Sequence, residues 1–210
     1  MDQLTLYDYL TFVLPGGVVL AVSTYASRGW PWPRPSAAIL VLLTGAAFVV
    51  GYAISGISNL VEPCFLGQRS LRNPDPLWGT LNGPSRMEDV EKQQLRGLLS
   101  ARYGKELTAT AAYRRALVEL RAKDKAPMLP TINQHLGFAR GMAVASMISA
   151  IILIACAIFG DSHLAVQFWV PVSAGAAALF IARFRRFWRW FGENVLRGIA
   201  EIVRQEQDGA

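Results

Sequence analysis

Four long apolar runs without a single charged residue constrain this sequence more than any other feature. Each run is close to the ~20 residues that a helix needs to cross the ~30 Å hydrocarbon core of a bilayer. Buried helices of soluble proteins rarely stay free of charge at this length four times in one chain. We therefore expect an all-α membrane protein with four transmembrane helices, in the runs 10–26, 36–60, 141–160 and 164–182.

The first run is expected to be a retained helix and not a cleaved signal peptide. A signal peptide begins with positive charge, whereas the residues before Leu10 include Asp2 and Asp8 and no Lys or Arg. The sequence Pro15-Gly16-Gly17 is expected to break or kink this helix.

The distribution of basic residues predicts the orientation of the chain. Thirteen Lys and Arg lie between the second and third runs and six follow the fourth, but only two separate the first from the second. Because cytoplasmic loops carry the excess of Lys and Arg, both termini and the middle segment should face the cytoplasm of a bacterial inner membrane. The expected parts are a transmembrane hairpin (1–62), a cytoplasmic helical insert (63–138), a second hairpin (139–183) and an amphipathic tail helix (184–210).

The insert carries the patterns of two amphipathic helices. The first, over 85–104, opens with a capping box at Ser85 and Glu88 and should stop at Gly104. The second covers 108–125, and a third begins at Pro130 and enters the membrane at Arg140. The expected apolar stripes are Met87, Val90, Leu95, Leu98 and Leu99, then Tyr113, Ala116, Leu117 and Leu120.

Two short helices bury little area, so we expect the insert to dock on a cytoplasmic protein partner or on further copies of the chain. The candidate contact residues are Arg114, Arg115 and Arg121. A solvated helix face is the alternative reading for each arginine.

Small residues recur at four-residue spacing in three of the apolar runs. Such faces let helices approach closely in lipid. Packing within one four-helix bundle is favoured over an oligomer interface, although both can hold at once. The faces are Ala47, Gly51 and Ser55, then Gly141, Ala145 and Ser149, and finally Ala174, Ala178 and Ala182.

The stretch after the fourth run combines arginines with aromatic residues. Its basic and Trp side chains suit an anionic lipid headgroup layer, and we expect an interfacial helix whose apolar face runs through Phe184, Phe187, Trp188 and Phe191 to Val195, Ile199 and Ile202. Packing onto the middle segment is an alternative, and direct nucleic-acid binding is disfavoured. The membrane-interface residues are Arg183, Arg185, Arg186, Trp188, Arg189 and Trp190.

Motifs for catalysis are missing from the sequence, which contains no nucleophile elbow, phosphate-binding glycine loop or zinc-ligand spacing. Asp161, Ser162 and His163 are consecutive, so they read as a tight turn and not as a catalytic triad. We expect a non-enzymatic protein without cofactor or metal. The absence of ionisable groups in the spans also disfavours a pump. A channel or small-solute transporter is the alternative function, and an integral membrane enzyme is third.

Two stretches carry a resemblance to known proteins, LYDYLTFVLPGGVVL (6–20) and INQHLGFARGMAVASM (132–147). Both resemble segments of small four-helix bacterial membrane proteins of uncharacterised families, which include membrane subunits of anti-phage systems. Proteins of this kind disturb the membrane or signal to a cytoplasmic partner. The resemblance implies an oligomeric membrane-disrupting effector or membrane-anchored sensor, with phage defence as its setting, and it implies no catalytic residues.

Overall fold

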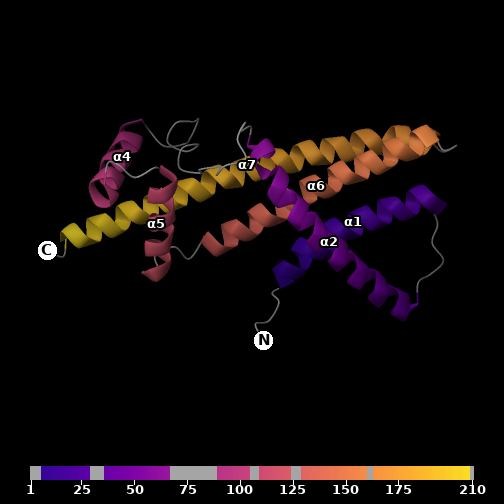
Figure 1. Ribbon diagram of the computed structural model, residues 1–210, viewed down its shortest axis with the longest axis horizontal. Helices are drawn as coiled ribbons and strands as arrows, with labels where there is room; N and C mark the ends of the chain where they lie inside the picture. Colours follow the sequence, from indigo (N-terminus) through magenta and orange to yellow (C-terminus); the bar gives the residue numbers. More distant parts are fainter. Residues whose placement is uncertain are drawn as a thin grey trace. The chain divides into compact units, whose positions relative to one another are not determined.

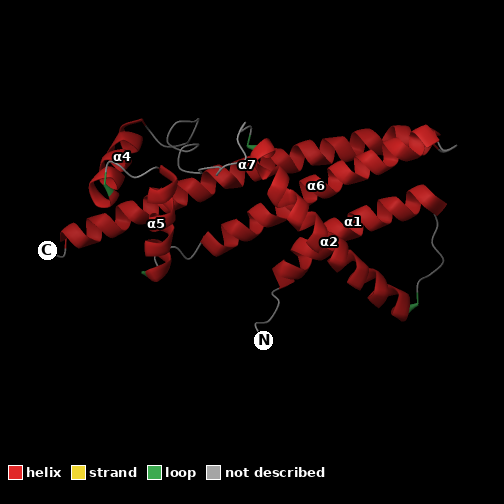
Figure 2. Cartoon of the chain, viewed as in Figure 1, coloured by secondary structure: helices red, strands yellow, loops and turns green. Residues whose placement is uncertain are grey.

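The computed structural model describes residues 6–28, 36–66, 89–104, 109–123, 129–159 and 163–208. Within these ranges the chain is helical and holds no strand, which confirms the all-α prediction (Figures 1 and 2). The capping box at Ser85 and Glu88 lies outside the described residues. The helices are α1 (Leu6–Arg28), α2 (Ala37–Phe65), α4 (Asp89–Tyr103), α5 (Ala109–Ala122), α6 (Leu129–Phe159) and α7 (His163–Asp208).

The chain divides into two compact units. The first unit consists of Met1–Gly67 with Gln134–Phe184, and the second of Gln68–Asn133 with Arg185–Ala210. The middle segment and the C-terminal tail, which the sequence pattern separates, therefore belong to one unit.

In the first unit, α1 and α2 cross with their backbones in contact (Figure 1). A Cβ added to Gly51 would overlap the carbonyl oxygen of Phe12, and one added to Gly16 would overlap that of Ala47. Only glycine permits an approach this close between two helices. The rings of Phe12 and Phe48 add an edge-to-face contact with centroids 5.6 Å apart, a favourable geometry for aromatic rings.

The small-residue face predicted for the second run is the face that meets α1. Ala47 and Gly51 are buried, and Ser55 is half-buried. This contact is made within one chain. A role for the same face between copies of the chain stays a prediction.

The small face of α6 is also buried within the first unit. Gly141, Ala145 and Ser149 lose nearly all their exposure, and a Cβ on Gly141 would stand 3.4 Å from Cγ of Pro15 in α1. α6 thus packs against the middle of α1 through its glycine.

The proline of α1 does not interrupt the helix, contrary to the expected break. α1 is continuous from Leu6 to Arg28 with Pro15 inside it. Proline removes a backbone donor and its ring crowds the preceding turn, but Pro15 is fully buried beside Gly141, whose missing side chain leaves room for the ring.

The small-residue face predicted for α7 does not pack within the chain, and its role between copies stays a prediction. Ala174, Ala178 and Ala182 are exposed, whereas Ala177 is buried. Phe180 contacts Phe138 of α6 edge-to-face, with ring centroids 6.1 Å apart. One residue turns a helix by about 100°, so the face that meets the neighbouring helix is one step away from the series chosen by spacing.

Two helices in the described part of the chain are long and apolar enough to cross a membrane, Ala37–Glu62 and Leu129–Phe159. Only 17% of the apolar window in the first, and 33% in the second, is buried inside the chain. Thr11–Ala26 is a shorter apolar helix. The four-span arrangement remains a prediction.

The second unit has a conventional apolar core between α4, α5 and the C-terminal part of α7. α5 lies across α7 (Figure 1), and a Cβ added to Gly198 would stand 2.6 Å from Cδ2 of Leu120. The core is made of Leu95 and Leu99 of α4, Ala116 and Leu120 of α5, and Val195, Leu196, Ile199 and Ile202 of α7.

Local patterns predicted several features of the two short helices, whereas Met87 and the side chain of Tyr113 lie outside what is described. α4 ends at Tyr103, and Gly104 follows with a φ of 90°, which confirms the predicted stop because glycine tolerates this left-handed conformation. Ala116 and Leu120 are buried as expected. Val90 is 65% exposed, so its place in the α4 stripe is wrong.

The apolar face of the tail is placed differently from the prediction. Val195, Ile199 and Ile202, expected to continue a lipid-facing surface, are buried in the core of the second unit. Phe184 and Phe191, expected on the same surface, are buried as well. Packing onto the middle segment, the alternative reading, therefore accounts for this part of α7. The pattern of an amphipathic helix is the same whether protein or lipid covers its apolar face.

The α1–α2 crossing predicts opposite effects for two glycine substitutions in the same helix. Gly51→Ala should destabilise the protein by about 1–3 kcal/mol, because the new methyl group must displace backbone atoms of α1. Gly56→Ala should be neutral or slightly stabilising, since a Cβ there meets nothing within 4 Å and alanine favours helix. Thermal unfolding of the purified protein in detergent measures both. Equal melting temperatures for the two variants would contradict the crossing.

Candidate functional site

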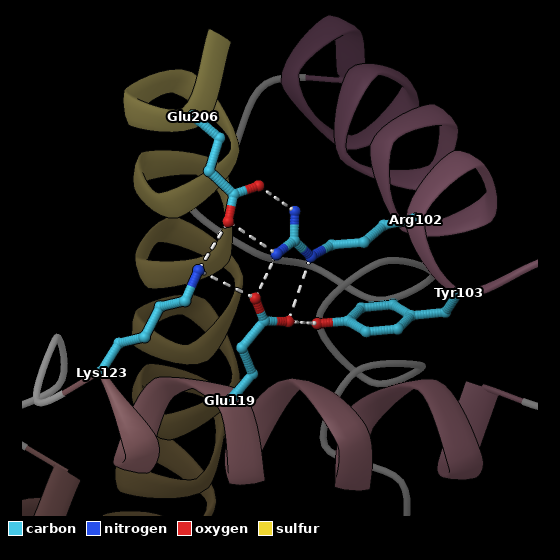
Figure 3. Close-up of polar contacts among 5 residues, drawn as sticks. All are labelled: Arg102, Tyr103, Glu119, Lys123 and Glu206. Atoms are coloured by element: carbon cyan, nitrogen blue, oxygen red, sulfur yellow. Dashed lines mark hydrogen bonds and ion pairs between the residues drawn. The ribbon is translucent and has the colours of Figure 1, made fainter. Parts of the chain in front are cut away.

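Five polar side chains from three helices of the second unit form one connected cluster (Figure 3). α4 contributes Arg102 and Tyr103, α5 contributes Glu119, and Lys123 follows α5 directly. α7 contributes Glu206 from its last turn. We call these residues the polar cluster.

Local helix chemistry places each member of the polar cluster. Gly104 ends α4, so Arg102 and Tyr103 lie in its last turn, where basic side chains are favoured by the helix dipole. Glu119 and Lys123 are four residues apart, and their charged groups approach to 3.4 Å across one turn. Such i,i+4 spacing brings side chains to the same helix face.

Arg102 binds two carboxylates at once. Its Nε donates to Oε2 of Glu119 at 3.0 Å, and its Nη2 donates to Oε1 of the same carboxylate. On the other side, Nη1 donates to Oε2 of Glu206 at 2.7 Å and Nη2 to Oε1 at 3.1 Å. Both contacts are bidentate, the arrangement that makes a guanidinium–carboxylate pair strong and directional.

Lys123 and Tyr103 complete the cluster around the carboxylates. Nζ of Lys123 donates to Oε1 of Glu206 at 2.6 Å, and the Tyr103 hydroxyl donates to Oε2 of Glu119 at 2.6 Å. Glu119 is the better-buried acid, with 20% of its side chain exposed against 47% for Glu206.

The contacts of the polar cluster shift its acid–base equilibria. The hydrogen bond from Arg102 lowers the pKa of Glu119 to about 2, and hydrogen bonds from Arg102 and Lys123 lower the pKa of Glu206 to about 2. Burial, together with the bond to Glu119, raises the pKa of Tyr103 to about 12. The hydrogen bond to Glu206 raises the pKa of Lys123. At neutral pH the cluster therefore holds two cations, two anions and a neutral phenol.

In the first unit, Arg140 of α6 forms an ion pair with Glu62 of α2. Nη1 of Arg140 donates to Oε2 of Glu62, and both side chains are mostly buried. Within the described part of the chain, the buried Nε of Arg140 has no hydrogen-bond partner. The pair joins the two helices that have the length and composition of membrane spans.

The predicted site residues on α7 and α5 do not belong to the polar cluster. Six of them lie along α7, and all are exposed except Trp188, which is half-buried. Arg115 and Arg121 are exposed on α5, and the side chain of Arg114 lies outside what is described. The α7 residues are Arg183, Arg185, Arg186, Trp188, Arg189 and Trp190. Their roles at a lipid surface and a partner stay predictions.

Sequence reasoning missed the polar cluster because its members are distant in the chain. Arg102 is 17 residues from Glu119 and 104 from Glu206. The i,i+4 pair of Glu119 and Lys123 was the one local signal. Among the described residues, no group of three or more His, Cys, Asp or Glu is placed to hold a metal ion.

Comparisons of the chain with protein-family models, with characterised proteins and with solved structures find no match. A functional assignment therefore depends on the surfaces and contacts described above.

The lowered carboxylate pKa values predict a loss of stability in acid that Glu206→Gln should reduce. A carboxylate with a folded pKa of about 2 and an ordinary value of 4.5 stabilises the fold above pH 4.5 and loses this effect as the pH falls toward 2. At pH 7 the melting temperature of the variant should be lower than that of the wild type. This difference in melting temperature should become smaller as the pH falls from 4.5 to 2. Thermal unfolding across this range measures it. A gap that is independent of pH would contradict the assignment.

Proposed function

We propose that this protein is a non-enzymatic integral membrane protein that holds a cytoplasmic helical module at the bacterial inner membrane. It acts there as a membrane-anchored sensor or as a membrane-disrupting effector. The outward-facing apolar surface of α2 and α6 carries the proposal. Strongly exposed apolar side chains on this surface include Val41, Leu42, Val49, Tyr52 and Leu60 of α2 and Ile151, Ile158 and Phe159 of α6.

Water is a poor environment for this surface. Removing apolar area from water is worth about 25 cal/mol per Å², and soluble monomers rarely leave patches above a few hundred Å² uncovered. A core helix of a soluble protein would be mostly buried by its own chain, whereas most of the apolar window in α2 and in α6 faces outward. Hydrocarbon is the covering that requires no further protein.

Features of α1 and α7 support two additional spans. α1 contains the apolar helix Thr11–Ala26 and packs on α2 by direct backbone contact. In α7, exposed Trp169 lies near the start of the apolar run 164–182, and half-buried Trp188 follows the run. Along an ideal helix these residues are about 29 Å apart at ~1.5 Å per residue, close to the ~30 Å between the two aromatic belts of a bilayer.

The exposed arginines support the cytoplasmic orientation. Arg183, Arg185, Arg186 and Arg189 follow the fourth apolar run and are all exposed. Each basic group near an anionic headgroup layer contributes about 1 kcal/mol of attraction. These residues with Trp190 are proposed to hold α7 at its correct depth, while the apolar face beyond Phe191 packs inside the second unit.

The second unit is proposed to receive the signal. It has its own apolar core and polar cluster, and α5 presents exposed Arg115 and Arg121 to a cytoplasmic protein partner. Copies of the chain are proposed to associate through the lipid-facing helices. This arrangement requires no bound cofactor.

The topology predicts where reporter fusions are active. Alkaline phosphatase fused after Trp32 should be active, because the segment between the first two spans faces away from the cytoplasm, and a fusion after Lys123 should be inactive. The protein should also stay in the membrane pellet after alkaline carbonate extraction. Release by carbonate would exclude the membrane assignment, and the reverse fusion pattern would exclude the orientation.

The effector form of the proposal predicts that overproduction depolarises cells. A potential-sensitive dye should report the loss in cells that make the wild type or Gly56→Ala, and a weaker effect with Gly51→Ala, whose α1–α2 packing is disturbed. An intact potential at equal membrane levels of protein would exclude the disrupting effector and leave the sensor.

A further inference from the structure

Charged contacts hold Glu206, in the last turn of α7, to the second unit. Among the described side chains of α7, Ile202 is the last buried one, Val203 is half-buried, and Arg204, Gln205 and Glu206 are exposed. Glu206 accepts hydrogen bonds from Arg102 of α4 and from Lys123, which follows α5 (Figure 3). Helix ends fray readily because their last carbonyls lack partners within the helix.

Removing Glu206 from the polar cluster would leave a cationic site. Arg102 and Lys123 would then face the single carboxylate of Glu119, and three of their hydrogen bonds would lose an acceptor. The bidentate face of Arg102 and the ammonium group of Lys123 are already oriented, because Glu119 holds both. Preorganised donors of this kind bind a carboxylate with a smaller entropic cost.

We propose that Arg102 and Lys123 form a binding site for an acidic segment of a protein partner, and that Glu206 occupies this site within the same chain until the partner displaces it. The class of ligand follows from the group that these donors bind now, which is a carboxylate on a helix. The proposal deepens the function proposed above and depends on it for the partner's location in the cytoplasm.

The surface of α5 favours an acidic peptide as the partner segment. Arg115 is exposed one turn before Glu119, on the same face of α5, and Val118 is 67% exposed. Further carboxylates and one apolar side chain of an acidic segment would match these residues in charge and polarity.

When Glu206 occupies the site, a partner cannot bind there. The apparent affinity for the partner should therefore fall in proportion to the fraction of time that the site is free. If the site is free about one-tenth of the time, the apparent affinity for a second carboxylate ligand falls about tenfold. Glu206→Gln removes the competing charge with little change in size. Glu201→Gln is the matched control, since Glu201 is an exposed acid of the same helix whose described contact is with Gln205.

The test measures binding of a fluorescent hexaglutamate peptide to the full-length protein in detergent at low salt, by anisotropy. Glu206→Gln should bind roughly tenfold more tightly than the wild type, and Glu201→Gln should match the wild type. Adding Lys123→Gln to Glu206→Gln should abolish the gain. A chain ending at Gln205 should behave like Glu206→Gln, and thermal unfolding checks that each variant is folded.

Two outcomes overturn the proposal. Equal affinity of the wild type and Glu206→Gln would show that the cluster only holds the fold together. Binding of pyrophosphate without binding of hexaglutamate would assign the site to phosphate and not to an acidic peptide. Because binding is measured in detergent, these outcomes are independent of carbonate extraction and reporter fusions, which test the membrane function separately.

Discussion

Apolar side chains that face outward from α2 and α6 are the constraint on which the rest of the first unit depends. A helix satisfies its own backbone hydrogen bonds, so it can place such side chains in hydrocarbon without cost to the peptide groups. Hydrocarbon, however, gives helices no hydrophobic reason to associate. In the proposed membrane setting, close packing would therefore hold α1 against α2, and Gly16 and Gly51 allow it because they lack the side chains that would keep the backbones apart.

The second unit is stabilised in the way of a small water-soluble domain. Leucine and isoleucine side chains of α5 and α7 fill its core, and the polar cluster connects three helices at its surface. A single helix, α7, contributes residues to both units. Its apolar first part carries Trp169 and Ala177, and its later part turns the apolar face toward Leu120. The change in composition between the two parts of α7 is visible in the sequence, because the arginines begin at Arg183.

Features set by neighbouring residues could be predicted from the sequence, and features set by distant partners could not. The helix stop at Gly104 and the buried positions Ala116 and Leu120 follow from local conformational preference and from one helical period. The exposed Ala174 series and the buried face at Ile199 depend on which helix or solvent lies opposite, and periodicity does not contain that information. The polar cluster could not be predicted for the same reason, because the contact between Glu206 and Arg102 depends on the packing of α7 against α5.

The ion pair between Glu62 and Arg140 gives α2 and α6 a directional contact that apolar side chains do not provide. In the proposed membrane setting, apolar side chains would have similar energies at neighbouring registers, and the two helices could slide or rotate past each other at small cost. A guanidinium and a carboxylate have a defined position, and an unpaired charge in a mostly buried place is costly. Arg140 also lies where the sequence predicts that α6 enters the membrane. We therefore infer that the pair fixes the register of α2 against α6.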